Sequence, residues 1–322
     1  MGRSQEVNRN RVAELAGVSS ATVSRVYNYP QRVAPEKRDR VLAAAAELGY
    51  RPNKAAAALR RNTSGTIMLL EWEKPQRSYY WKRLKVFNWF YADVIHGLQE
   101  VIDTSMYGLK LKRIRHLDDA GPYMKEADGI IGFDIDRLEE ARELQSLGIP
   151  YILCHHTDGF EGFHRCSTDN RLGGVLQAQY LYDQGCRRAA YLTGYLDSVY
   201  VHRERLEGFS TRCRELGMEL DVYPHAMEDG QGWQDSWDAV AAVNDLTLLK
   251  MLQLAPGEAA DRPLVGYDAM PIRSLVSKGF PSVDPRPREI YHRSAELLME
   301  MLNGTANAYC TREIIKPVLV DI

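Results

Sequence analysis

The sequence predicts two unlike parts: a small all-α head containing a helix-turn-helix, and a larger α/β part with parallel sheets. In the first 50 residues, apolar positions recur at the three- and four-residue spacing of helix faces, and glycines end each run. Beyond residue 65, short apolar runs alternate with amphipathic stretches, as strands alternate with helices around a parallel sheet. A chain of 322 residues has room for one small and one or two larger domains.

The segment 11–28, RVAELAGVSSATVSRVYN, predicts two short helices joined by a tight turn. Asn8 can cap the first helix and Gly17 can end it, because glycine readily adopts the left-handed conformation found at helix ends. Ser19 or Ser20 can cap the second helix by accepting hydrogen bonds from its free N–H groups. The pattern alone is compatible with an ordinary helical hairpin and with a helix-turn-helix that binds DNA.

A third helix is predicted over residues 33–50, with Pro35 in its first turn and Gly49 at its end. The three helices can close a small core through their apolar faces. The first helix would contribute Val12, Ala13, Leu15 and Ala16. The third would contribute Val41, Leu42, Ala45 and Leu48.

The head is basic, whereas the remainder is acidic. Residues 1–65 contain twelve Lys and Arg and five Asp and Glu, a net charge of +7, although the whole chain carries −2. A basic head suits nucleic-acid phosphates, because cationic side chains displace their counterions. The outer face of the second helix carries small or hydrogen-bonding residues that would let it approach a DNA groove. The candidate DNA-binding residues of the head are Arg9, Ser19, Ser20, Ala21, Thr22, Ser24, Arg25 and Asn28.

Two motifs, AGVSSATVSRVYN and RVLAAAAELGYRPNKAAAALR, resemble the headpiece and hinge of the lactose-repressor (LacI/GalR) family of bacterial transcription regulators. The match runs without a gap from about Val12 to Leu70. Two positions depart from the family pattern. Arg9 stands where an apolar residue is usual, so we expect it to face phosphate, and Ala34 stands where a Ser or Thr usually caps the third helix.

Residues 51–62, RPNKAAAALRRN, correspond to the hinge of this family. An isolated helix of this length is unstable in water, because helix nucleation is costly. The resemblance implies a hinge helix that forms on operator DNA, pairs with its twin in a dimer, and inserts Leu59 into a minor-groove step. The alternative is a helical linker whose Leu59 covers the core. The candidate DNA-binding residues of the hinge are Lys54, Ala55, Ala58 and Leu59.

The motifs ADGIIGF, GIPYILC, STDNRLGG, RAAYLTG and VGYDAMPI resemble the effector domain of the same family, which is similar to periplasmic sugar-binding proteins. The resemblance implies two lobes, three crossings of the chain between them, and a ligand in the cleft. The expected domains are the headpiece and hinge, 1–62, and an effector-binding and dimerisation domain, 63–322. Lobe 1 would comprise about 63–167 and 286–310, and lobe 2 about 168–285 and 311–322.

Three polar residues match effector-binding positions of the family. Arg205, in R-x-x-G-F, matches an arginine that reaches an effector's hydroxyls or carboxylate, although it could also be a solvated helix cation. Asp268, in G-Y-D, matches an acid that chelates vicinal hydroxyls. Asn244, in A-V-N-D, would end a strand at the cleft, while its neighbour Asp245 could merely cap the following helix.

Aromatic residues and a histidine complete the expected cleft. Trp89 and Phe90 could stack on an apolar sugar face, with core packing as the alternative. His155 could line the cleft; the spacing of the nearby His, Asp and Cys residues fits no standard metal site. The segment 71–87, basic and aromatic, is longer than the family's usual loop and borders the expected cleft mouth. It would suit an oligosaccharide or an anion, or be an ordinary surface loop.

Other features bound the function. No standard motif of hydrolases, metalloproteases, nucleotide-binding or dinucleotide-binding enzymes occurs, so we expect neither catalysis nor a cofactor. The polar N-terminus and the lack of a long apolar run predict a cytoplasmic protein without a membrane span, and five scattered cysteines predict reduced thiols. The chain lacks the leucine-rich tail of tetrameric family members, which predicts a homodimer on a palindromic operator.

The combined prediction is a repressor controlled by a small molecule, a sugar or sugar derivative. The alternatives are a sugar-binding protein without a regulatory role, or a regulator that uses a nucleobase or an anion as its effector.

Overall fold

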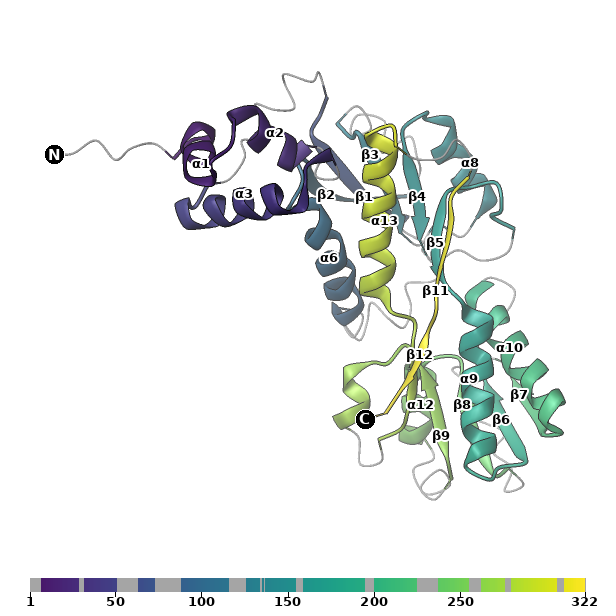
Figure 1. The fold of residues 1–322 in the computed structure, drawn as a ribbon. Coiled ribbons are helices and arrows are strands. Elements are labelled where there is room, and N and C mark those ends of the chain that lie inside the picture. Colours follow the sequence, from purple (N-terminus) through teal and green to yellow (C-terminus); the bar gives the residue numbers. More distant parts are fainter. Residues whose placement is uncertain are drawn as a thin grey trace.

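The computed structural model describes residues 7–28, 32–50, 63–72, 88–115, 126–133, 135, 137–154, 159–194, 200–224, 237–254, 262–275, 279–305 and 310–321. It consists of a helical head and two α/β lobes (Figure 1). No helix in the described ranges is long and apolar enough to cross a membrane.

The head contains α1 (Arg9–Ala16), α2 (Ser20–Asn28) and α3 (Pro35–Leu48), close to the predicted ranges. The predicted caps are confirmed: the Asn8 side chain accepts from two backbone N–H groups of the first turn, and Gly17 and Gly49 end α1 and α3 with φ near +60°. Ala34 makes no side-chain cap, as its methyl group requires.

The core of the head differs from the predicted stripes at two leucines. Val12, Val23 and Val41 are fully buried, as expected for facing helices. Leu15 and Leu42, however, are 47% and 37% exposed, and small residues of α3 fill the contact with α1 instead. The three helices approach closely, so the narrow buried face has room for alanine and valine but not for every leucine of a wide stripe.

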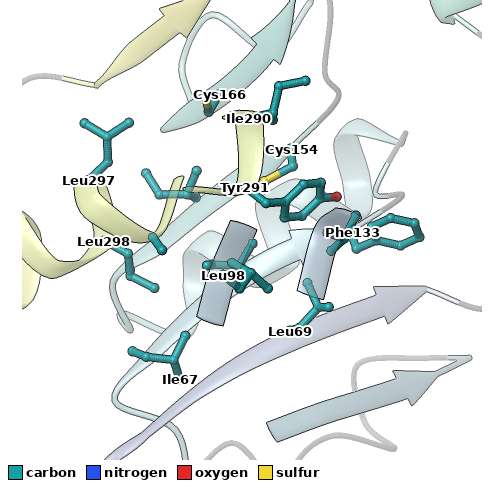
Figure 2. Close-up of a cluster of buried hydrophobic side chains, with 14 of the residues drawn as sticks. Ile67, Leu69, Leu98, Phe133, Cys154, Cys166, Ile290, Tyr291, Leu297 and Leu298 are labelled. Atoms are coloured by element: carbon teal, nitrogen blue, oxygen red, sulfur yellow. The ribbon is translucent and has the colours of Figure 1, made fainter. Parts of the chain in front are cut away.

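The first lobe is built on a six-stranded parallel sheet with the order β11-β5-β4-β3-β1-β2. Its strands are β1 (Thr66–Trp72), β2 (Gly108–Ile114), β3 (Gly129–Phe133), β4 (Tyr151–Cys154), β5 (Arg165–Thr168) and β11 (Arg312–Ile315). The helices are α6 (Asn88–Ile102), α8 (Leu138–Ser146) and α13 (Pro287–Leu302). Residues of α6 and α13 form one buried cluster with the sheet (Figure 2), and α8 joins a second cluster.

The second lobe contains a six-stranded sheet with the order β12-β10-β9-β8-β6-β7. Its strands are β6 (Arg188–Leu192), β7 (Glu219–Tyr223), β8 (Ala239–Ala242), β9 (Leu264–Tyr267), β10 (Ser282–Asp284) and β12 (Val318–Val320). Only β12 pairs antiparallel among the described pairs. The helices are α9 (Asn170–Asp183), α10 (Tyr200–Leu216), α12 (Asp245–Leu254) and the 3-10 helix η4 (Pro271–Leu275).

The chain passes between the two sheets three times, as the resemblance implied. It does so after β5, after β10, and between β11 and β12. The third crossing corrects the expected boundary. Residues 312–315 pair with β5 of the first sheet, so the last segment of lobe 2 begins after Ile315 rather than at residue 311. Hydrogen bonding to β5, which is distant in sequence, decides which sheet residues 312–315 join. The local sequence of these residues does not indicate this pairing.

Helices α9 and α10 cross in close contact at glycines. A Cβ on Gly208 would overlap the carbonyl oxygen of Arg171 and come within 2.7 Å of its carbonyl carbon. Gly174 meets the backbone of α10 in the same way. The glycine of the R-x-x-G-F motif is therefore required by helix packing.

Gly208→Ala should destabilise the protein by about 1 to 3 kcal/mol, because the obstructing atoms belong to backbone and cannot rotate away. Urea denaturation of the full chain would measure the change. Gly162→Ala is the matched control, since a Cβ there would meet nothing within 4 Å and its φ is ordinary. Equal stability of the two variants would contradict the assignment.

Candidate functional site

The outer face of α2 presents the predicted polar residues. Ser19 caps α2: its hydroxyl accepts from the Thr22 N–H at 3.1 Å and lies 2.9 Å from the Thr22 hydroxyl. Arg9 is exposed, as its charge requires, and its Nε donates to the Ser20 hydroxyl at 2.7 Å. Ala21 and Arg25 are also exposed. The face therefore combines a small alanine side chain with hydroxyl and guanidinium groups. Such a surface can approach a DNA groove and bind its phosphates.

Two further predicted DNA-binding residues lie on α2, and the four of the hinge do not belong to the described part of the chain. Ser24 is partly buried on α2, and Asn28 is the last residue of that helix. Lys54, Ala55, Ala58 and Leu59 lie outside the described residues. The roles predicted for the hinge stay predictions.

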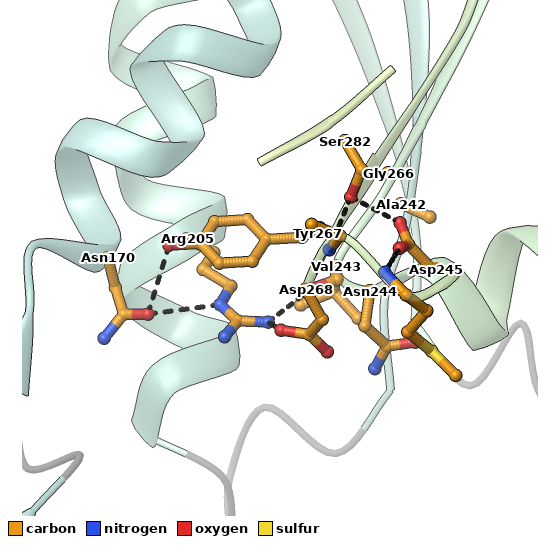
Figure 3. A network of polar contacts seen from close by, with 12 residues as sticks. Asn170, Arg205, Ala242, Val243, Asn244, Asp245, Gly266, Tyr267, Asp268 and Ser282 are labelled. Atoms are coloured by element: carbon orange, nitrogen blue, oxygen red, sulfur yellow. Dashed lines mark hydrogen bonds and ion pairs between the residues drawn. The ribbon is translucent and has the colours of Figure 1, made fainter. Parts of the chain in front are cut away.

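Arg205 is the centre of a buried polar network in the second lobe (Figure 3). It is 7% exposed, so the alternative of a solvated helix cation is wrong. Its Nη1 lies 3.1 Å from Asp268 Oδ1 and donates to the Val243 carbonyl at 2.8 Å. Its Nε donates to Asn170 Oδ1 at 3.1 Å, and the guanidinium lies 3.6 Å from the centroid of the Tyr267 ring. Three segments far apart in sequence thus converge on one cation.

In the Arg205–Asp268 pair, solvent reaches Asp268 more readily than Arg205. The side chain of Asp268 keeps 22% of its surface exposed, whereas that of Arg205 keeps 9%. Burial raises the pKa of Asp268, and the adjacent guanidinium opposes this rise. The pKa of Arg205 lies above its ordinary value: burial lowers it, but the charge and hydrogen bond of Asp268, together with Tyr267 and Tyr191, outweigh burial. The geometry is that of an ion pair whose carboxylate can still meet a ligand.

Asp268 lies in a strained turn at the end of β9. Its φ is +93°, and that of Ala269 is +49°. Non-glycine residues seldom adopt positive φ, and such strain is concentrated at functional sites. The turn directs the Asp268 carboxylate toward Arg205.

The helix cap expected of Asp245 is made by its neighbour Asn244. Asn244 is the residue that caps α12: its Oδ1 accepts from the N–H and the hydroxyl of Thr247, both at 2.9 Å. Asp245 instead accepts from the Met270 N–H and the Ser282 hydroxyl. The capping role suggested for Asp245 is therefore wrong. Because the Asn244 oxygen is already bonded, an effector contact there would have to come from Nδ2.

The two predicted aromatic residues pack in the same cluster of the first lobe but differ in burial. Phe90 is 9% exposed and packs against Phe133 in the core of the first lobe, which confirms the core-packing alternative for this residue. Trp89 is only partly buried, and its ring lies edge-on to Phe90 with centroids 5.6 Å apart. Trp89 remains a candidate for stacking.

Other predictions for this region fall largely outside the described residues. These include His155 and residues 73–87. The first two residues of the expected loop belong to β1: Trp72 is buried in the core, and Glu71 accepts from Arg113 Nε at 2.7 Å. The remaining part of the predicted basic, aromatic loop stays a prediction.

Sequence reasoning missed Asn170 and Tyr267, which hold Arg205. Both lie inside motifs that were recognised, STDNRLGG and VGYDAMPI, but nothing local indicates that their side chains meet. The Tyr191 hydroxyl and the Thr193 hydroxyl lie buried at the end of β6, with no hydrogen-bond partner among the described residues. The described residues contain no group of three or more His, Cys, Asp or Glu side chains arranged to hold a metal ion.

Comparison with known proteins accounts for both parts of the chain. Residues 10–53 match the family described as bacterial regulatory proteins, lacI family, and residues 178–321 match a periplasmic binding protein-like domain. The regulator CelR of Thermobifida fusca is 30% identical over 94% of each chain. The repressor PurR of Vibrio vulnificus is 27% identical over 90% of each chain.

Solved structures show the same architecture. The complex of the transcriptional regulator CelR with cellobiose covers 98% of this chain and 99% of its own, with 25% identity and a TM-score of 0.66. The lac repressor dimer bound to operator and the anti-inducer ONPF covers 98% of each chain, with 21% identity and a TM-score of 0.64, and supports the fold alone. The helix-turn-helix head, the two-lobed domain and the extent of the match to CelR lead to one conclusion: this chain belongs to the LacI family of bacterial regulatory proteins.

Proposed function

We propose that this DNA-binding transcription regulator is a repressor that binds a palindromic operator as a homodimer and responds to a neutral sugar bound between its lobes. The Arg205–Asp268 pair carries the proposal. It combines a donor in a fixed orientation with a partly exposed acceptor, the two groups that adjacent hydroxyls of a polyol require.

The charge balance of the site favours a neutral effector over an anion. The charge of Arg205 is already matched by Asp268. Further carboxylates lie nearby: burial and the charges of Asp93 and Asp268 raise the pKa of Asp284, against the opposing effects of the Arg286 N–H and the Arg286 charge. A carboxylate or phosphate placed here would meet these acids at short range and in a poorly solvated place.

The site also offers a nucleobase fewer suitable contacts than it offers a sugar. The Tyr267 ring, which could stack on a base, is already covered by the Arg205 guanidinium. A sugar requires hydroxyl partners, and the buried hydroxyls of Tyr191 and Thr193 are further candidates. A solved regulator named CelR, 25% identical to this chain, is a complex with cellobiose, so cellobiose is the first compound to test.

Cellobiose should raise the melting temperature of the full-length protein, whereas glucose 6-phosphate and adenine should not. At one hundred times its dissociation constant, a ligand that binds only the folded state stabilises it by about 2.7 kcal/mol, enough for a shift of several degrees. Arg205→Ala should lose the shift. The decisive control is operator binding, because a protein that binds cellobiose without any change in operator affinity would be a sugar-binding protein without a regulatory role. A shift with adenine or the phosphate alone would contradict the neutral-sugar assignment.

A further inference from the structure

The strained turn 268–270 is held by three consecutive backbone N–H groups. Asp268 N–H donates to the Val283 carbonyl at 2.8 Å, and Ala269 N–H donates to the Ser282 hydroxyl at 2.9 Å. Met270 N–H donates to Asp245 Oδ2 at 2.6 Å. All three acceptors belong to β10 or α12, which are distant in sequence from the turn. External partners thus keep two consecutive residues at positive φ.

Asp245 connects two of these three bonds. Its Oδ1 accepts from the Ser282 hydroxyl at 2.7 Å, so it holds both the Met270 amide and the serine that holds the Ala269 amide (Figure 3). Both Asp245 and Ser282 are fully buried. Gly266 makes room for the carboxylate, because a Cβ at that position would overlap Asp245 Oδ1.

We infer that Asp245, acting with Ser282, is the positioning residue for Asp268: it holds the turn in the conformation that directs the Asp268 carboxylate to Arg205 and to the effector. The inference rests on the proposed function, in which Asp268 binds the effector. Asp245 itself does not meet Arg205 through any described contact. Its influence passes through the backbone of the turn.

The protonation state of Asp245 supplies a signature of this role. Burial, together with the charge of Asp268, raises the pKa of Asp245 to about 8. The Ser282 hydroxyl, the Met270 N–H and the charge of Arg273 oppose it. When the 268–270 turn is closed on Asp245, the Asp245 carboxyl group holds a proton at neutral pH. If the turn opens and water reaches Asp245, the group returns to its ordinary pKa and releases this proton. Closure is favoured most at low pH and loses that advantage as the pH rises toward 8.

An asparagine at position 245 can keep both bonds. Its carbonyl oxygen accepts from the Met270 N–H while its amide nitrogen donates to the Ser282 oxygen, as a protonated aspartic acid would; the Ser282 bond is then reversed relative to the carboxylate, which accepts from that hydroxyl. An alanine keeps neither bond. Asp245→Asn is therefore the conservative variant, and Asp245→Ala and Ser282→Ala are the disruptive ones.

Hydrogen exchange in the unliganded full-length protein tests the inference without an effector. In Asp245→Ala and Ser282→Ala, the amides of the turn should exchange about tenfold faster, the equilibrium effect of one lost hydrogen bond. Asp245→Asn should retain their protection. Ser294→Ala is the matched control, because Ser294 is equally buried but lies in the first lobe.

The pH dependence separates positioning by Asp245 from a general structural role. After correction for intrinsic exchange, protection of the turn in the wild type should fall by up to about tenfold per pH unit toward pH 8 and then level off. Asp245→Asn should show no such slope. In the disruptive variants, cellobiose affinity should fall about tenfold while operator affinity without sugar stays unchanged.

Three results would decide between the two proposals. Wild-type exchange rates in Asp245→Ala and Ser282→Ala would overturn the inference, and so would an unchanged pH slope in Asp245→Asn. The third result is a wild-type protein that does not bind cellobiose, combined with the expected differences in exchange between the variants and the wild type. It would count against the proposed effector and for the positioning of the turn by Asp245.

Discussion

Arg205→Ala should abolish the effect of the sugar on operator binding and destabilise the second lobe. The guanidinium bonds Asn170, the Val243 carbonyl and Asp268, and its loss leaves a carboxylate without its cation. Breaking a buried pair in this way typically costs about 3 to 5 kcal/mol. We expect the low end, because Asp268 is 22% exposed and water can partly compensate. In the wild type, a saturating effector should shift operator affinity by about 5- to 150-fold.

Operator titration with and without cellobiose, together with urea denaturation, would measure both effects. The double variant Arg205→Ala, Asp268→Asn removes the unpaired charge, so it should regain part of the stability but none of the response. Arg203→Ala is the control, because Arg203 is exposed on the same helix. If Arg205→Ala still responds to the sugar as the wild type does, the effector does not use this pair.

Arg25→Ala should weaken binding to the operator by about 1 to 3 kcal/mol and binding to a scrambled duplex much less, because one bidentate base contact discriminates by that amount. The structure leaves Arg25 exposed on α2, next in sequence to the partly buried Ser24. The operator would first be selected from a random duplex library. Fluorescence anisotropy on both duplexes then gives the two losses.

Arg9→Ala is the informative comparison for this experiment. Its guanidinium contacts Ser20 across the two helices and is expected to meet phosphate, so the variant should lose affinity for both duplexes alike and show a smaller salt dependence. Equal losses on both duplexes for Arg25→Ala would assign Arg25 to phosphate as well and leave the base-reading role to other residues of the face.

Features that depend on neighbouring residues were predictable from the sequence. The bounds of α1 and α3 follow from a cap, a proline and glycines that act within one helical turn, and the alternation of strands and helices follows from runs of apolar residues. The family was predictable as well, because its motifs are contiguous.

Features that depend on distant residues were not predictable in this way. Asn244 and Asp245 are adjacent and equally suited to cap α12. Asn244 makes the cap, because the 268–270 turn and Ser282 approach Asp245 and donate hydrogen bonds to it. The same holds for β11, whose sheet is chosen by its pairing partner.

The sequence by itself therefore determined the helical head, the α/β class, the family and the identities of Arg205 and Asp268 as candidates. Only the tertiary structure decided that these two residues, 63 positions apart, form an ion pair with Asp268 partly exposed, and that Tyr267 and Asn170 contact Arg205. The physical reason is range: caps and periodicity act over a few residues, whereas burial, ion pairing and backbone strain arise where separate elements pack together.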